Sequence, residues 1–86
     1  MKKKIIKFET ENCMFCKVLQ PRLEELVVNN DNVELQRIVV EANNSYGIVS
    51  VPTIYIENED GSRELICSGA GNLSDILNKI KEKING

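Results

Sequence analysis

Two cysteines three positions apart carry the clearest chemical signal in this chain. Cys13 and Cys16 enclose Met14 and Phe15, a spacing used both by redox dithiols and by zinc sites. The chain contains no histidine, which excludes imidazole-dependent nucleophile systems and every histidine-ligated metal site. Cys67 is the third and last cysteine, so a zinc site would lack its fourth ligand unless a carboxylate or a second chain supplied it. The pattern favours redox chemistry without a metal, with a zinc site completed by another ligand or a purely structural disulfide as the alternatives.

The spacing has a physical basis if the motif opens a helix. Two sulfurs on the first helical turn can close a disulfide with little backbone movement. The free N–H groups and the positive end of the helix dipole favour the thiolate of the first cysteine. A thiol with a pKa of about 8.5 is about 3% ionised at pH 7, whereas a pKa near 7 makes it about half ionised. We therefore expect Cys13 to be the nucleophile and Cys16 its resolving partner.

The residues around the motif predict a strand before it and a helix after it. Lys4 to Glu9 is predicted to be a short buried strand, and Asn12 is the expected N-cap. A helix should run from Cys13 to about Val28, because apolar residues form one stripe, namely Leu19, Leu23, Leu26 and Val27. Pro21 lies inside that helix and should kink it.

The rest of the chain predicts three more strands and a closing helix. The strands are expected at Val33–Val40, Val51–Glu57 and Arg63–Ser68, with a polar connection at Glu41–Gly47 and an Asp60–Gly61 turn before the last strand. Asn72 should cap the closing helix, with Asp75 three residues later and a buried stripe of Leu73, Ile76, Leu77, Ile80 and Ile84.

This order predicts an α/β fold in one domain over residues 1–86. The first two strands should be parallel and the last two antiparallel, in a mixed four-stranded sheet (βαβ, then ββα) flanked by helices. A net charge of -2 and a pI near 5.1 argue against a nucleic-acid partner. The sequence has no apolar stretch long enough for a membrane span or a signal peptide. We expect a cytoplasmic monomer.

In these motifs and their spacing, the sequence resembles the thioredoxin family. The stretch from Cys13 to Leu23 is similar to the thioredoxin active-site helix, with Lys17 after the second cysteine and the kinking Pro21 further on. The stretch from Tyr46 to Thr53 resembles the segment that leads into the family's cis-proline. Gly61 and Gly69 fall at the spacing of its hairpin turn and its substrate-facing loop. The resemblance covers about residues 4–84 and implies a thioredoxin-like fold.

The resemblance also implies an activity, which is the reduction of protein disulfides by dithiol exchange. It implies a cis Val51–Pro52 bond beside the cysteines, and a substrate-binding surface made of Met14, Phe15, Val51, Pro52 and Gly69. The expected partners are an NADPH-dependent thioredoxin reductase and disulfide-containing proteins. No cofactor is expected beyond the Cys13–Cys16 disulfide itself. Met14 and Phe15 replace the family's usual Gly-Pro, which leaves the redox potential open. We expect neither side chain to point into the core from the helix tip.

Two other functions stay open on the sequence. The trimmed outline resembles glutaredoxin, which binds glutathione, although Ser50–Pro52 and Gly69–Asn72 match its contacts only approximately. Glu9 and Glu11 would also repel the carboxylates of glutathione, so we rank the glutathione-dependent activity second. A thioredoxin-fold binding module with an incidental dithiol is the non-enzymatic alternative.

Lys7 is the sharpest departure from the family, because it occupies the position of a buried aspartate. We expect Lys7 to lie beneath the dithiol, with Glu41 as its ion-pair partner, and to favour the thiolate of Cys13 rather than accept a proton. The alternative is a solvated strand residue. Cys67 is expected to be a buried, inert thiol, with a regulatory or dimer-forming role as the alternative.

Overall fold

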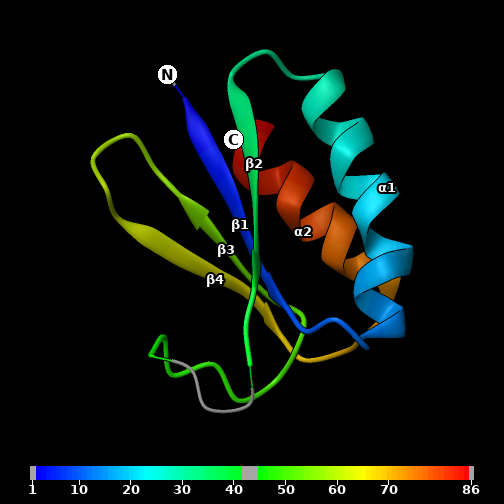
Figure 1. The fold of residues 1–86 in the computed structure, drawn as a ribbon. Coiled ribbons are helices and arrows are strands. Elements are labelled where there is room, and N and C mark those ends of the chain that lie inside the picture. The colour runs from blue at the N-terminus through cyan, green and yellow to red at the C-terminus, as the bar shows by residue number, and fades with distance from the viewer. Residues whose placement is uncertain (1, 42–44, 86) are drawn as a thin grey trace.

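The structure, a computed structural model, describes residues 2–41 and 45–85. Within these ranges the chain forms four strands and two helices (Figure 1), in the order β1 (Lys3–Glu9), α1 (Met14–Val28), β2 (Val33–Val39), β3 (Thr53–Glu57), β4 (Arg63–Ser68) and α2 (Leu73–Asn85). The predicted elements are all present, and their ends differ from the predicted ones by at most two residues.

The strands form one mixed sheet in the order β2-β1-β3-β4. β1 is parallel to β2 and antiparallel to β3, and β3 is antiparallel to β4. The predicted parallel and antiparallel pairs are confirmed. β1 is therefore a central strand, and the residues that follow it start from the middle of the sheet.

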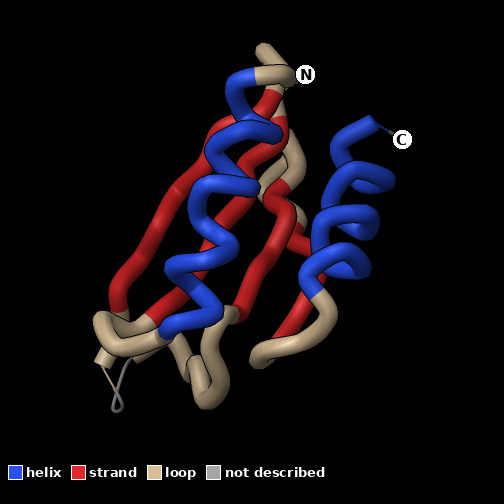
Figure 2. Tube along the Cα trace, turned by 90° about the vertical axis from the view of Figure 1, so that its right-hand side faces the viewer, coloured by secondary structure: helices blue, strands red, loops and turns tan. Residues whose placement is uncertain are grey.

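Both helices cover the same face of the sheet, as Figures 1 and 2 show. The sequence predicted flanking helices without assigning them to one side. The main core lies under these helices, where apolar side chains of α1 and α2 meet those of the strands, among them Ile5, Leu19, Leu23, Ile54, Ile56, Ile76 and Ile80. Because the stripes of both helices turn toward the sheet, the predicted apolar patterns are satisfied by one shared core.

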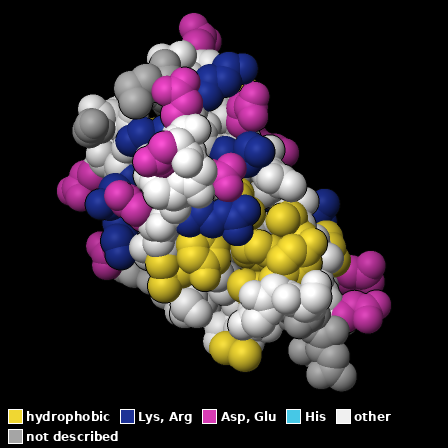
Figure 3. Space-filling model, turned by 90° about the vertical axis from the view of Figure 1, so that its left-hand side faces the viewer, with side chains coloured by type: hydrophobic (Ala, Val, Ile, Leu, Met, Phe, Trp, Pro, Cys, Tyr) yellow, Lys and Arg dark blue, Asp and Glu magenta, His cyan; other side chains and the backbone are white. Residues whose placement is uncertain are grey.

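The opposite face of the sheet carries a second, smaller apolar cluster. Ile6, Phe8 and Val40 are buried there, and the side chains packed against them come from strands and from the segment before β3, namely Ile38, Ile48, Val51 and Tyr55. Figure 3 views this side and shows apolar side chains gathered among charged ones. The ring of Tyr46 covers part of this face, because its centroid lies 5.1 Å from the centroid of the Phe8 ring. No helix of the described residues packs on it.

Two local predictions are changed by the structure. The N-cap of α1 is Cys13 rather than Asn12, because the Cys13 carbonyl accepts the first helical hydrogen bond, from Lys17 N at 3.2 Å. β3 begins at Thr53, so Val51 and Pro52 precede the strand instead of opening it. The cap of α2 is as predicted, since Asn72 Oδ1 accepts from Asp75 N at 3.1 Å.

Part of the predicted Glu41–Gly47 connection lies outside the described residues. No described helix is long and apolar enough to cross a membrane.

Candidate active site

Three separate segments meet at one end of the sheet because of the strand register. Phe8, near the end of β1, pairs with Thr53 at the start of β3, and Thr53 pairs with Ser68 at the end of β4. The dithiol follows β1, the Val51–Pro52 segment precedes β3, and Gly69 follows β4. The topology therefore brings the cysteines and two of the predicted substrate-binding segments to the same edge.

The dithiol sits at the N-terminus of α1 as a closed disulfide. Cys13 and Cys16 are bonded, with their Cα atoms 5.2 Å apart. Cys16 N donates to Cys13 Sγ at 3.1 Å, so a free N–H of the first turn points at the first sulfur. Cys13 is partly exposed, whereas Cys16 is fully buried. This N–H and the helix dipole would both stabilise a thiolate on Cys13.

The segment before β3 is tied to the loop after β4. The Val51–Pro52 peptide bond is cis. The Pro52 carbonyl accepts from Gly69 N at 2.8 Å, and Thr53 Oγ1 donates to the Ser50 carbonyl at 2.6 Å. Gly69 has a φ of 96°, a conformation that favours glycine. These bonds hold Pro52 and Gly69 together as one surface at the dithiol end of the sheet.

The two residues between the cysteines lie in different environments. Met14 is 71% exposed. Phe15 is only partly exposed and packs against the main core, so the expectation that neither side chain could reach the core is wrong for Phe15. A helix tip at the edge of a sheet turns one of two successive side chains inward. Met14 is the residue of this pair that is free to contact another protein.

Lys7 is fully buried beneath the dithiol helix. Its Nζ atom donates to the Cys16 carbonyl at 2.9 Å and to Gln20 Oε1 at 2.6 Å. The ion-pair partner is Glu9, whose Oε1 lies 2.7 Å from Lys7 Nζ, rather than the predicted Glu41. Residues two apart on a strand share a face, so the sequence spacing could have identified this pair.

Glu9 is the second buried charge, with 3% of its side chain exposed. The same Oε1 atom also accepts from Arg37 Nε on β2, at 2.8 Å. Burial alone would raise the pKa of Glu9, but the hydrogen bonds and charges of Arg37 and Lys7 outweigh it and hold the pKa below its usual range. Since this carboxylate is buried and paired, Glu9 cannot repel glutathione as expected, and only Glu11 of that pair is exposed.

Cys67 lies on β4 with its thiol half-buried. Its Sγ atom is 3.8 Å from the Pro52 carbonyl, within weak hydrogen-bond range for sulfur. Burial raises the pKa of the Cys67 thiol, against smaller opposing effects of Ile54 and Lys79. Cys67 is therefore only partly buried, not buried as expected. A thiol that stays protonated is a poor nucleophile, so the raised pKa supports the prediction of an inert side chain.

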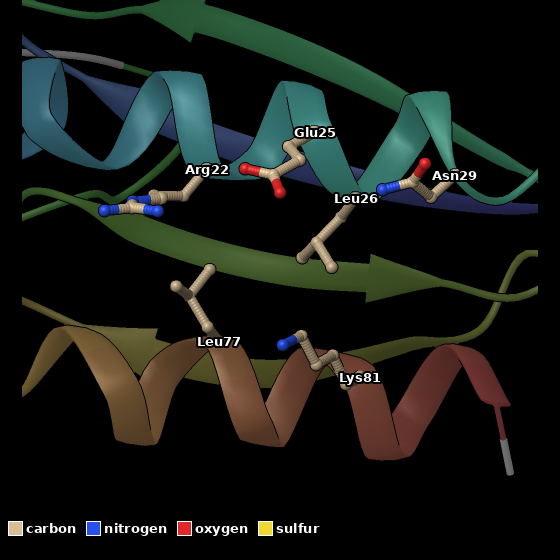
Figure 4. Close-up of a pocket in the computed structure, with 6 residues that line it drawn as sticks. All are labelled: Arg22, Glu25, Leu26, Asn29, Leu77 and Lys81. Carbon is tan, nitrogen blue, oxygen red and sulfur yellow. The ribbon is translucent and has the colours of Figure 1, made fainter.

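Among the hollows on the surface of the described residues, one lies beside the dithiol and another lies far from it. Beside the dithiol, a hollow of about 420 Å³ is lined by Thr10, Glu11, Asn12, Val39, Val40 and Glu41. A second hollow, of about 170 Å³, lies between the later turns of α1 and α2 (Figure 4) and is lined by Arg22, Glu25, Leu26, Asn29, Leu77 and Lys81. Its lining residues come from both helices, and neither cysteine is among them. Among residues 2–41 and 45–85, no three acidic or cysteine side chains cluster as a metal site would require.

The match to a family model agrees with this arrangement. The chain matches the Thioredoxin family over residues 1–82, and it belongs to that family. The helix-capping Cys13–Cys16 disulfide is the kind of redox-active pair that such proteins carry, which supports a thiol–disulfide oxidoreductase in general terms.

Solved structures share the fold at low sequence identity. The thioredoxin of Fasciola hepatica superposes with a TM-score of 0.75 at 24% identity, covering 98% of this chain and 79% of the other. Mitochondrial thioredoxin 3 of Saccharomyces cerevisiae gives 0.71 at 23% identity, with 98% and 77% coverage. The structure of a malarial protein superposes with a TM-score of 0.68 at 17% identity, covering 95% of this chain and 97% of the other. A search of the curated proteins found no significant match.

Proposed function

We propose that this protein reduces disulfide bonds in other proteins by dithiol exchange through Cys13 and Cys16. The observation that carries the proposal is the unequal exposure of the two cysteines within a closed pair at a helix N-terminus. Cys13 is partly exposed and receives an N–H, while Cys16 is fully buried behind it. This difference in exposure supports Cys13 as the attacking thiolate and Cys16 as the resolving thiol.

The exchange balances in two steps. The Cys13 thiolate attacks one sulfur of the substrate disulfide, forming a mixed disulfide and releasing the other substrate sulfur as a thiolate. Cys16 then loses its proton and attacks Cys13 Sγ, which releases the second substrate thiol and closes the Cys13–Cys16 bond. Two electrons pass from the dithiol to the substrate.

The substrate surface is proposed to combine Met14 with the Val51, Pro52 and Gly69 segment. Met14 offers an exposed apolar side chain, and the Pro52–Gly69 link fixes the segment that faces the same edge of the sheet. An extended substrate strand could pair with the Val51 backbone, since strand addition supplies main-chain hydrogen bonds without demanding a particular sequence. Phe15, half-buried, contributes less contact area than the sequence suggested.

The proposed electron donor is an NADPH-dependent thioredoxin reductase, with disulfide-containing proteins as substrates and a cytoplasmic monomer as the working form. Family membership supports this donor. Because Glu9 does not face the solvent, repulsion of glutathione is a weaker argument than the sequence indicated. One coupled assay therefore decides the donor. NADPH consumption with a thioredoxin reductase and insulin is expected, and turnover only with glutathione and glutathione reductase would reverse the assignment.

The roles of the two cysteines can be tested by trapping. The reduced Cys16→Ser variant should accumulate a mixed disulfide with a protein substrate, because nothing remains to resolve it. Cys13→Ser is the matched control and should trap nothing, since the buried Cys16 is out of reach. The measurement is the fraction of protein shifted in mass on a non-reducing gel. Equal trapping by both variants would contradict the assignment, and failure of the reduced wild type to reduce insulin would favour a binding module.

A further inference from the structure

Three side chains of alternating charge, Lys7, Glu9 and Arg37, lie in a row beneath the dithiol helix. The row contacts the helix at the Cys16 carbonyl, which accepts from Lys7 Nζ at 2.9 Å. Glu9 Oε1 lies 2.7 Å from that nitrogen, and Arg37 Nε lies 2.8 Å from the same oxygen. The row contains two cations and one anion, so the cluster of Lys7, Glu9 and Arg37 carries one net positive charge.

The ammonium of Lys7 is fixed in place. An ammonium has three N–H donors, and Lys7 has three acceptors, namely the Cys16 carbonyl, Gln20 Oε1 and Glu9 Oε1. No donor is left over for a sulfur atom, so Lys7 cannot hydrogen-bond a thiolate without giving up one of these contacts. Any effect on the dithiol must therefore act through space, where burial strengthens it.

The sign of such an effect follows from charge alone. A cation near a thiol favours the thiolate and an anion opposes it. We propose that Glu9 and Arg37 are positioning residues for the dithiol, Glu9 limiting and Arg37 restoring the stabilisation that Lys7 gives to the Cys13 thiolate. This inference rests on the proposed function, in which Cys13 is the attacking sulfur.

The neighbouring elements contribute weaker fields. β3 places the uncharged Ile54 opposite Lys7, and β2 places Arg37 opposite it on the other side. The other charged side chains near the dithiol, Glu11, Lys17 and Glu41, are exposed. Water and salt screen exposed charges far more than buried ones, so the buried Lys7–Glu9 pair should dominate.

The cluster then affects the redox equilibrium as well as the rate. Reduction of the Cys13–Cys16 disulfide takes up two electrons and two protons, or one proton where Cys13 remains a thiolate. At a pH above the thiol pKa, stabilising that thiolate therefore favours the reduced protein over the disulfide. In the test below the electrons come from dithiothreitol, which is oxidised to its cyclic disulfide. At a pH well below the thiol pKa, both sulfurs are protonated and the effect should vanish.

The experiment compares three single substitutions in reduced protein, with the thiol pKa read from the ultraviolet absorbance of the thiolate against pH. Lys7→Met should raise the Cys13 pKa by about one unit, a tenfold change. Glu9→Gln, which keeps an acceptor oxygen for Lys7, should lower it by about half a unit. Arg37→Gln should raise it slightly, because half of its side chain is exposed. The reduction potential measured by equilibration with dithiothreitol should shift in the same order among the variants. A tenfold change in the equilibrium constant corresponds to about 30 mV.

Glu57→Gln is the matched control, because Glu57 also lies between a lysine and an arginine but at the other end of the sheet. It should leave the thiol pKa unchanged. A purely structural cluster would move the pKa in one direction for all three variants, or by no more than the control, and either result would overturn the proposal. Glu9→Gln and Arg37→Gln test the opposite signs even if Lys7→Met does not fold. If the wild type fails to reduce insulin, that result counts against the proposed function, but the thiol pKa values of the variants can still be compared.

Discussion

The two ends of this sheet contain the same charged trio in different surroundings. At the dithiol end, Glu9 lies between Lys7 and Arg37, at 2.7 and 2.8 Å. At the other end, Glu57 lies between Lys4 and Arg63, at 3.9 and 3.0 Å. The arginines are equally exposed, at 51% and 50% of their side chains, but Lys7 is 0% exposed where Lys4 is 37%. Residue type is therefore a poor guide to the role of a charge, and the depth of the lysine separates the two ends.

The largest expected difference between the two ends is in stability. Lys7→Met removes a buried ammonium and leaves Glu9 buried with Arg37 alone, so we expect a loss of about 2–3 kcal/mol in the free energy of unfolding. Lys4→Met, the equivalent change at the more exposed trio, should lower the free energy of unfolding by no more than about 0.5 kcal/mol. Urea denaturation of both variants at neutral pH measures the difference. Similar losses for the two lysines would mean that burial does not distinguish the ends.

The second difference should appear in acid. The pKa of Glu9 is lowered in the folded protein, so its contribution to stability is complete above the unfolded-state value of about 4.3 and is lost as the pH falls through the folded value. Between about pH 5 and 3, Glu9→Gln should therefore lose less stability than the wild type. Glu57→Gln leaves the buried cluster intact and should keep the acid loss that Glu9 causes. Urea midpoints measured across this range decide it, and parallel curves for wild type and Glu9→Gln would refute the assignment.

The smallest expected effect concerns one glycine at each end. Gly69 and Gly61 have φ values of 96° and 89°, so alanine at either should cost about 1–2 kcal/mol in backbone strain. A Cβ on Gly61 would meet nothing, and one on Gly69 would lie 3.5 Å from Ser50 Cβ, an ordinary contact. Only Gly69→Ala should slow insulin reduction, by about threefold or more if the loop contacts substrate. Equal rates for the two variants at matched stability would remove Gly69 from the proposed substrate surface.

Local patterns were enough to predict most of the fold. The Cys13–Val28 pattern located α1 despite Pro21, because its apolar stripe continues across the proline. The Asn72 cap located the start of α2 to the residue. The strand directions followed from the lengths of the connections. Each of these depends on neighbours in sequence, which is why each could be read from it.

Long-range placement is where the sequence was insufficient. The sequence places Lys7 beneath the dithiol, and the structure confirms it. The order of the strands points to Glu41 as its partner, whereas the two-residue period of a strand joins Lys7 to Glu9. Arg37 entered the cluster through the parallel register with β1, which no local pattern specifies. Phe15 turned toward the core because α1 lies close over the sheet. The placement of both helices on one face also depends on packing between distant elements.

The central position of β1 has a consequence for folding during synthesis on the ribosome. β2 can pair with one edge of β1 once residues up to Val39 have emerged, but the other edge waits for β3, which begins at Thr53. During that interval the nascent chain presents an unpaired strand edge and the apolar side chains of Ile5, Ile6 and Phe8, which are buried in the finished sheet. Exposed edges of this kind are where newly made chains aggregate or recruit chaperones. Slowing synthesis between residues 40 and 57 should lengthen that vulnerable interval, whereas slowing it after β4 should not.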